Sequence, residues 1–131
     1  MTRITQLDHF GVPVRDLQAA RDWYTGFLGM ELRHDSSNLD PAVATPNVQV
    51  KSGDVVIFLF RLLMNGESLA TLPGPSPAVT FTVRDPAAAV AYLQEQSYPF
   101  EGPVELDNGQ RVVFFRDPDE NLLAFEVPQN R

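Results

Sequence analysis

The sequence HFGVPVRDLQAARDWY at residues 9–24 recurs as AVTFTVRDPAAAVAYL at residues 78–93. Both copies contain the tripeptide VRD at the same place, and apolar residues precede it at matching positions. A repeat of this kind indicates one supersecondary unit of strand, turn and helix that the chain uses twice. The copies differ at their first position, because His9 of the first copy corresponds to Ala78 of the second.

Length, composition and charge limit the class of protein. The 131 residues suffice for one compact domain, or for two half-domains that share a core. The absence of cysteine excludes disulfides, thiolate metal ligands and cysteine nucleophiles. The net charge of -7 argues against nucleic acid or an anionic membrane surface as a partner. The N-terminal sequence lacks the apolar stretch of a secretory signal, and the apolar run at 55–64 is too short to span a bilayer. We therefore expect a cytoplasmic protein without a membrane partner.

Hydrophobic periodicity predicts the elements of the first half of the chain. Alternating apolar residues predict a strand at 6–14. Asp16 is a suitable helix N-cap, and apolar residues then recur at helical spacing up to Gly29, which ends the helix. The remaining predicted elements are strands at 30–33, 47–51 and 55–62, a loop at 35–41 and a hairpin turn at 52–54.

The second half repeats this order after a break. The stretch 65–77 is rich in Gly, Ser and Pro, and we expect it to be a linker. A strand at 78–83 and a helix at 86–96, capped by Asp85, then match the opening of the first half. The last predicted elements are strands at 104–106, 111–116 and 121–127, with turns at 107–109 and 117–120. This order predicts an α+β fold with mixed sheets, each covered by a helix on one face.

Two stretches carry the pattern of a known family. The opening, Leu7–Leu17 followed by Trp23-Tyr24 and Phe27–Leu32, resembles the start of the vicinal-oxygen-chelate superfamily. The ending, Val113–Leu123, is similar to the closing hairpin of the same superfamily. Its members include glyoxalase I, bleomycin- and fosfomycin-resistance proteins, and extradiol dioxygenases.

The resemblance implies an α+β fold of two βαβββ modules whose curled mixed sheets surround a shared cup. The first module is expected at 1–64 and the second at 78–131, joined by the linker at 65–77. Because members of the superfamily often dimerise, a homodimer is also expected, and the cup combines modules within or between chains. The fold hosts many chemistries, so the resemblance alone leaves the function open.

This chain keeps one of the four metal-ligand positions that the resemblance implies. Metal-dependent members place ligands on the first and last strand of each module. His9 matches the first of these positions, and a neutral imidazole is a good ligand for Zn, Ni or Fe. The other positions fall on Ala78, on Ala124, and on Phe58 or Phe60. We therefore favour no cofactor, with a divalent metal as an alternative.

Glu126 is the residue that could replace a missing ligand. Strand alternation places Leu122, Ala124 and Glu126 on one face, which is expected to face the cup. Two residues along a strand span about 6.6 Å, whereas a metal–oxygen bond is about 2.1 Å. A metal bound by His9 and Glu126 therefore requires a shifted strand or a displaced ion.

Three other charged positions have structural interpretations. Arg15 and Arg84 occupy the same place in both copies, where they could bind an anion; we prefer to interpret them as solvent-facing turn charges beside a helix cap. Glu120 stands where the turn of the superfamily usually has Gly. Because Gly adopts positive φ without steric cost, Glu120 predicts either a strained backbone or a different turn type.

Three functions follow, and whether the protein is an enzyme stays open. The leading hypothesis is a metal-independent binder of an apolar or aromatic small molecule, of the bleomycin-resistance type. The first alternative is a metal-dependent lyase, isomerase or ring-cleaving dioxygenase with His9 and Glu126 as ligands. The second is a metal-free isomerase or cyclase in which His9 or Glu126 is the catalytic acid or base. The residues expected to line the cup or contact its ligand are His9, Phe58, Phe60, Thr80, Leu122, Ala124 and Glu126.

Overall fold

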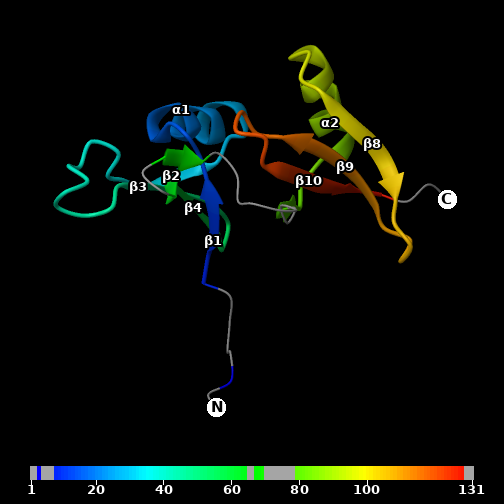
Figure 1. The fold of residues 1–131 in the computed structure, drawn as a ribbon. Helices are drawn as coiled ribbons and strands as arrows, with labels where there is room; N and C mark the ends of the chain where they lie inside the picture. The colour runs from blue at the N-terminus through cyan, green and yellow to red at the C-terminus, as the bar shows by residue number, and fades with distance from the viewer. Residues whose placement is uncertain (1–2, 4–7, 65–66, 70–78, 129–131) are drawn as a thin grey trace. The chain divides into compact units, whose positions relative to one another are not determined.

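A computed structural model describes residues 3, 8–64, 67–69 and 79–128 of the chain. The chain forms two compact units, Met1–Pro73 and Gly74–Arg131 (Figure 1). The boundary between them falls inside the stretch that the sequence predicts as a linker, most of which lies outside the described residues.

The first unit has a four-stranded mixed sheet with a helix packed on it. Its strands lie in the order β1-β4-β3-β2, with β1 parallel to β4 and the other neighbours antiparallel. The helical segment α1 packs against β3 and β4. The elements are β1 (Phe10–Pro13), α1 (Leu17–Asp22), η1 (Trp23–Phe27), β2 (Glu31–Asp35), β3 (Asn47–Ser52) and β4 (Val55–Phe60).

The second unit has the same topology. Its strands lie in the order β7-β10-β9-β8, with β7 parallel to β10, and α2 packs against β10. The elements are β7 (Val79–Phe81), α2 (Pro86–Glu95), β8 (Phe100–Glu105), β9 (Arg111–Arg116) and β10 (Leu122–Val127). The predicted α+β fold of two repeated βαβββ modules is therefore confirmed. The shared cup depends on how the units sit together, and it stays a prediction.

Both helices begin where the sequence places their caps. The Asp16 carboxylate accepts a hydrogen bond from the Ala19 amide (3.0 Å), and Asp85 accepts the matching bond from Ala88 (3.1 Å). These bonds satisfy amide groups that have no partner inside the helix. The first helix ends at Gly29, whose φ of 76° is the left-handed conformation that glycine favours.

The structure differs from the sequence prediction at three elements. The first helix widens into the π-helical turn η1, in which the Leu28 amide donates to the Trp23 carbonyl (3.1 Å). Glu67–Leu69 of the expected linker form the strand β6, which pairs with β5 (Leu62–Met64). Strand β8 starts at Phe100 instead of residue 104, because it continues across a register shift between Glu101 and Val104.

Alternating residues of the central strand β4 separate the core of the first unit from the opposite face of the sheet. Ile57 and Leu59 are fully buried, as are Val48 and Val50 of the neighbouring strand β3. Phe58 and Phe60, which point to the opposite face, are half-buried. This face is the one that presents aromatic side chains.

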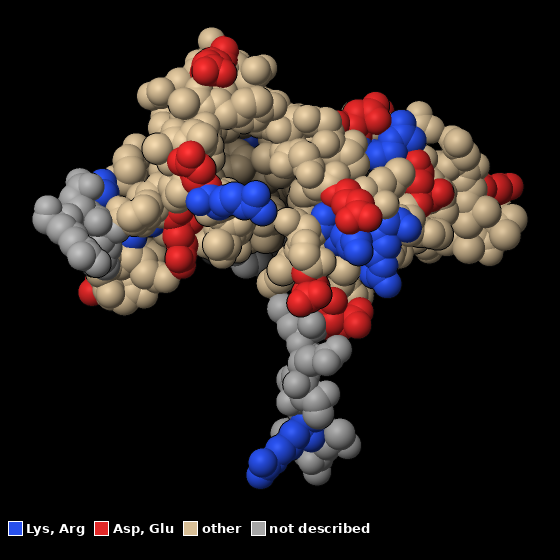
Figure 2. Space-filling model, turned by 180° about the vertical axis from the view of Figure 1, so that it is seen from behind, with Lys and Arg blue, Asp and Glu red and all other residues tan. Residues whose placement is uncertain are grey.

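Figure 2 shows acidic and basic side chains beside one another at several places on the surface of the protein. None of the helices in the part of the chain that the structure describes has the length and apolarity needed to cross a membrane.

Candidate functional site

The face of the first sheet to which Phe58 and Phe60 point has an aromatic shelf, which consists of these two residues and His9. The His9 imidazole stacks on the Phe58 ring, with centroids 3.8 Å apart and planes 17° apart. Phe60 lies over Gly11: a Cβ atom on Gly11 would be 3.0 Å from Cε1 of Phe60. Parallel pairing of β1 with β4 sets Gly11 opposite Phe58, and strand alternation then turns His9, Phe58 and Phe60 to one side. A flat aromatic molecule can extend this stack.

Polar groups border the aromatic shelf. Nδ1 of His9 lies 2.8 Å from the Asp8 carboxylate, so Nε2 is the ring nitrogen that a ligand would use. On strand β3, Gln49 lies opposite Phe58 and Asn47 lies opposite Phe60. The Gln49 side-chain amide donates to the Asn47 side-chain oxygen (2.9 Å). The sequence prediction missed these two amides, although their alternation with buried Val48 and Val50 was the signal that could have found them.

The predicted site residues of the second unit lie on and beside strand β10. Leu123 and Phe125, which are predicted to face the helix, are buried. On the opposite side Leu122 is half-buried, whereas Ala124 is completely buried. A ligand could reach Ala124 only if its present neighbours moved.

The two polar residues predicted for the second unit are exposed. Thr80 lies on β7 opposite Ala124. The Glu126 carboxylate accepts a hydrogen bond from the Gln110 side-chain amide (2.6 Å). Glu126 is therefore already engaged within its own unit.

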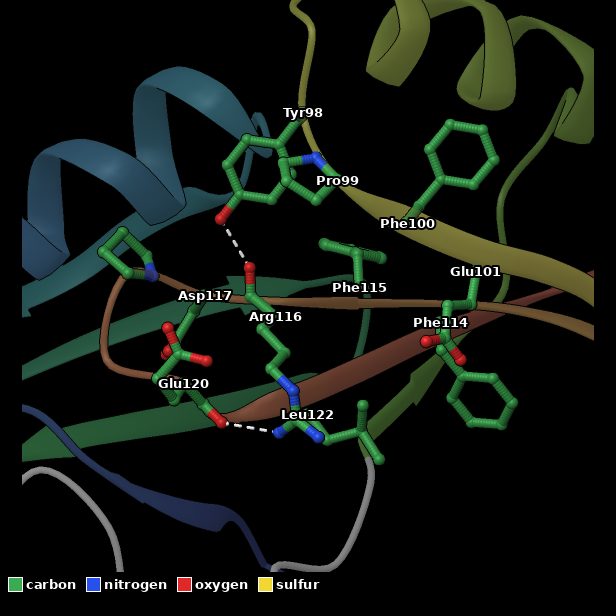
Figure 3. Close-up of a pocket in the computed structure, with 11 residues that line it drawn as sticks. Tyr98, Pro99, Phe100, Glu101, Phe114, Phe115, Arg116, Asp117, Glu120 and Leu122 are labelled. Atoms are coloured by element: carbon green, nitrogen blue, oxygen red, sulfur yellow. Dashed lines mark hydrogen bonds between the residues drawn. The ribbon is translucent and has the colours of Figure 1, made fainter.

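A pocket of about 530 Å³ lies at the Tyr98–Glu101 edge of the second sheet. Arg116 makes two hydrogen bonds in this pocket (Figure 3). Its guanidinium Nη1 donates to the Glu120 carbonyl (2.8 Å), and its backbone carbonyl accepts a hydrogen bond from the Tyr98 hydroxyl. Leu122 is the one predicted site residue in its wall. The other side chains of the wall include Pro99, Phe100, Glu101, Phe114, Phe115, Asp117 and Pro118.

The Tyr98 hydroxyl stays protonated across the physiological range. Burial, followed by the charges of Asp117 and Glu120, raises the pKa of Tyr98 to about 12. A neutral phenol is a hydrogen-bond donor, and here it holds the Arg116 carbonyl. Tyr98 therefore acts as a hydrogen-bond donor within the pocket wall.

Comparison with known proteins assigns the family. A family model of the Glyoxalase/Bleomycin resistance protein/Dioxygenase superfamily matches residues 6–125. The chain belongs to this superfamily. The match covers the chain from β1 to β10 and therefore includes both βαβββ modules.

Solved structures of the superfamily include proteins of several kinds. TnmS3, an antibiotic-binding protein from Streptomyces sp. CB03234, is 27% identical, with a TM-score of 0.73 over 98% of this chain and 100% of that one. A glyoxalase/bleomycin resistance protein from the same strain is 29% identical, with a TM-score of 0.64 over 90% and 96%. Lactoylglutathione lyase from Agrobacterium tumefaciens is 20% identical, with a TM-score of 0.68 over 95% of each chain, and it shares the fold.

Two of the positions that correspond to metal ligands in the superfamily have side chains without a donor atom, whereas His9 at the first position has one. The strand pairings match Phe58 of the first unit with Ala124 of the second, because they lie opposite Gly11 and Thr80 at the same place in the two copies. A phenyl ring and a methyl group provide no donor atom. In the described part of the chain, no three His, Asp or Glu side chains lie close enough to hold an ion.

His9 and Glu126, the two ligands expected for a divalent metal, belong to different units. Their pairing depends on how the units, or two copies of the chain, are arranged. It therefore stays a prediction, as does a catalytic role for either residue.

Proposed function

We propose that the protein binds an apolar or aromatic small molecule in its cup without a metal, as an antibiotic-binding or sequestering member of the superfamily. The observation that carries the proposal is the stack of His9 on Phe58 at the place where metal-dependent members have a ligand. A second ring, Phe60, widens the shelf beside it.

The aromatic shelf would provide most of the binding free energy, and the polar groups beside it would orient the ligand. Each apolar square ångström removed from water contributes about 25 cal/mol, and a well-placed aromatic pair adds about 0.5–1.5 kcal/mol. Nε2 of His9 and the side-chain amides of Asn47 and Gln49 can bond a ligand's carbonyl or hydroxyl groups. Leu122 and Phe114 offer a comparable apolar surface in the second unit.

The similarity to TnmS3 supports this class of function. That protein is an antibiotic-binding protein, and its similarity to this chain extends over 98% of the residues. We further propose that the cup is completed in a homodimer, as is common in the superfamily.

The test is isothermal titration of the full chain, in chelator, with a panel of flat polycyclic compounds that includes antibiotics. We expect at least one compound to bind without being altered, and Phe58→Ala to weaken its binding about tenfold through the lost stacking and apolar contact. Phe114→Ala reports whether the second unit contributes. Tyr92→Ala, which removes an exposed ring on α2, is the control and should bind normally.

Three outcomes would contradict the proposal. Binding that survives both Phe58→Ala and Phe114→Ala would remove the aromatic surfaces from the site. Conversion of the compound in chelator, lost in His9→Ala or Glu126→Ala, would favour a metal-free isomerase or cyclase. Conversion that requires an added ion would favour a lyase, isomerase or dioxygenase.

A further inference from the structure

The face of the first sheet that carries the aromatic shelf also has a polar half. Strand pairing places Gln49 of β3 opposite Phe58 of β4, and His34 of β2 opposite Gln49. Residues paired across neighbouring strands have their side chains on the same face of a sheet. A single row therefore runs across three strands, from the Phe58 ring to the Gln49 amide and on to the His34 imidazole.

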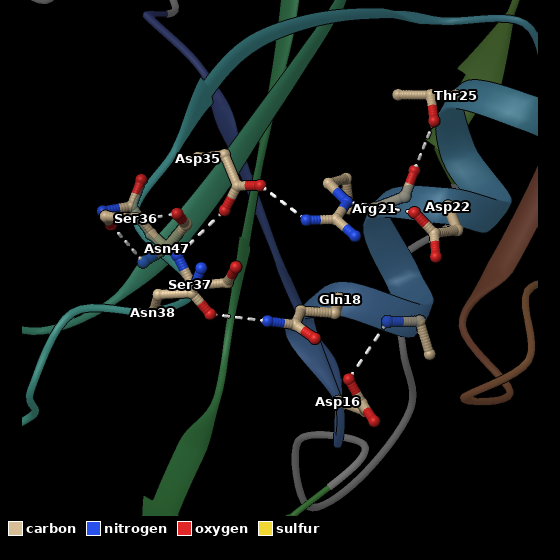
Figure 4. A network of polar contacts seen from close by, with 11 residues as sticks. Asp16, Gln18, Arg21, Asp22, Thr25, Asp35, Ser36, Ser37, Asn38 and Asn47 are labelled. Atoms are coloured by element: carbon tan, nitrogen blue, oxygen red, sulfur yellow. Dashed lines mark hydrogen bonds and ion pairs between the residues drawn. The ribbon is translucent and has the colours of Figure 1, made fainter.

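A bulge in β2 places the imidazole in this row. The pairing of β2 with β3 shifts by one residue just before His34. Without this shift, Arg33 would lie opposite Gln49. The next residue, Asp35, lies on the helix side of the sheet, where it accepts a hydrogen bond from Arg21 of α1 (2.7 Å; Figure 4). His34 therefore lies on the shelf side, and the bulge presents an imidazole there instead of a guanidinium.

The half-buried Gln49 side chain keeps groups that can bond a ligand. Its amide donates to the Asn47 side-chain oxygen (2.9 Å), and this bond orients it. Its side-chain carbonyl accepts no hydrogen bond from the residues that the structure describes. A primary amide can both donate and accept hydrogen bonds, and so can a neutral imidazole. Both groups of the row therefore suit hydroxyl groups, which also donate and accept.

The charged side chains beside this row form an ion pair. Lys51 lies two residues from Gln49 on β3 and thus on the same face, and Glu31 of β2 lies opposite it. The Lys51 ammonium is 3.8 Å from the Glu31 carboxylate. Because these two charges offset each other, the polar half presents neutral hydrogen-bonding groups and not a net charge.

We propose that this face binds an aromatic molecule with an uncharged, hydroxyl-bearing arm, such as a sugar. The ring lies on Phe58, and the arm lies over Gln49 and His34. The inference rests on the proposed function and specifies the class of its ligand. Neighbouring strands are about 4.8 Å apart, so the arm reaches groups about 5–10 Å from the stacked ring.

The second sheet has a different row at the corresponding place. Its strand pairings place Phe114 opposite Ala124, and Glu101 opposite Phe114. An aromatic ring thus occupies the position of the Gln49 amide, and a carboxylate occupies the position of the His34 imidazole. We therefore expect the preference for a hydroxylated arm to depend on the first unit.

The test is a fluorescence titration of the full chain with naphthyl glucoside and with methoxynaphthalene, which has the same ring and ether oxygen without the sugar. We expect the glucoside to bind about tenfold more tightly, through its hydrogen bonds to the polar half. Gln49→Leu and His34→Ala should each remove most of this preference without weakening methoxynaphthalene, whereas Phe58→Ala should weaken both compounds. Gln94→Leu makes the same change at an exposed position of α2 and should keep the preference.

The possible failures are distinguishable. If methoxynaphthalene binds through Phe58 but the glucoside binds no more tightly, this inference is wrong and the proposed function stands. If neither compound binds, the aromatic shelf is not a binding site and the proposed function fails as well. A preference that survives both Gln49→Leu and His34→Ala would also overturn the inference.

A charged arm provides a further comparison. Naphthyl glucuronide adds a carboxylate to the sugar, and tighter binding of this compound than of the glucoside would contradict an uncharged arm. Thermal midpoints check that the variants fold. If Gln49→Leu does not fold, His34→Ala at the exposed edge of the row carries the test.

Discussion

A single residue, Glu120, holds a backbone conformation that its side chain disfavours. Its φ is 69°, in the left-handed region, where the superfamily turn usually has Gly. The sequence predicts either a strained backbone or a different turn type, and the positive φ of Glu120 corresponds to the first of these. The turn is maintained by Asp117, whose carboxylate accepts hydrogen bonds from the amides of Asp119 (2.9 Å) and Asn121 (2.8 Å). Three buried polar residues thus fix the backbone through which the chain enters β10.

Replacing this residue by glycine should stabilise the protein. A left-handed conformation costs a non-glycine residue about 1–2 kcal/mol, part of which is offset by the greater freedom of glycine in the unfolded chain. We expect Glu120→Gly to raise the free energy of unfolding by about 0.5–1 kcal/mol and the melting temperature by about 1–4 °C. Thermal and urea unfolding measure both quantities.

The control for this variant is Glu120→Gln, which removes the charge but keeps the side chain and therefore the strain. It should unfold at nearly the unchanged midpoint. A glycine variant less stable than the glutamine variant would contradict the argument, because it would show that the Glu side chain stabilises the turn.

At the scale of elements, a network of hydrogen bonds and ion pairs connects β2 to α1. Arg21 of α1 donates to the Asp35 carboxylate at the end of β2 (2.7 Å) and to neighbouring Asp22 (3.0 Å), as Figure 4 shows. Hydrogen bonds from Ser37 and Arg21 lower the pKa of Asp35 to about 2. The ionised carboxylate therefore contributes to the free energy of unfolding.

The pH dependence of this contribution follows from the direction of the shift. The folded pKa lies below the ordinary value of 3.8, so the contribution is present above pH 4 and is lost as the pH falls toward 2. Discounted for solvent screening, it amounts to about 1 kcal/mol. Asp35→Asn should be less stable than the unchanged chain by that amount at pH 6 and by almost nothing at pH 2, measured by urea unfolding.

The control is Asp22→Asn, which also removes a partner of Arg21 but at a side chain that is 71% exposed. It should change stability little at either pH. A deficit in Asp35→Asn that persists unchanged at pH 2 would contradict the electrostatic explanation.

The sequence predicts the elements that depend on local chemistry. The caps at Asp16 and Asp85 and the hairpin at 52–54 are correct, because side-chain type and alternation determine them within a few residues. Strand β6 is not predicted and β8 is predicted only in part, since both depend on pairing with a neighbouring strand. The spacing of the apolar residues does not distinguish the π-helical turn η1 from a continuous α-helix.

The candidate site, too, can be predicted from the sequence only in part. Alternation along β4 predicts that Phe58 and Phe60 share a face, but the stack with His9 requires the register of β1 against β4. The Tyr98 pocket is missed because it joins the start of β8 to the end of β9, and the sequence does not show the pairing that brings these two segments together.

At the scale of the whole molecule, the repeat preserves topology while its surfaces have diverged. Both sheets have the same strand order, yet His9 and Phe58 of the first unit correspond to Ala78 and Ala124 of the second. Apolar groups thus replace donor atoms in both copies. We expect no specific metal binding because too few side chains with donor atoms occupy the ligand positions. This expectation does not depend on the protonation state of a single side chain.

Added metal ions should therefore leave the protein largely unchanged. A site-bound ion stabilises the folded state in proportion to the logarithm of its concentration above the dissociation constant. We expect Ni, Mn, Fe, Co and Zn to produce no saturable rise in melting temperature, and protein purified without a tag to contain metal far below one ion per chain. A large saturable rise with one ion, abolished in His9→Ala, would overturn this expectation.

The loop at residues 36–46, which joins β2 to β3, offers a place for a reporter group. Its base is closed by the Ser36–Asn47 hydrogen bonds, and its side chain Val43 is 75% exposed. Because the chain contains no cysteine, Val43→Cys would introduce its sole thiol. A fluorophore attached there would sit on the loop that contributes Leu39, Pro41 and Pro46 to a pocket of the first unit, so the fold itself supplies the design of an optical sensor for any molecule that enters this pocket.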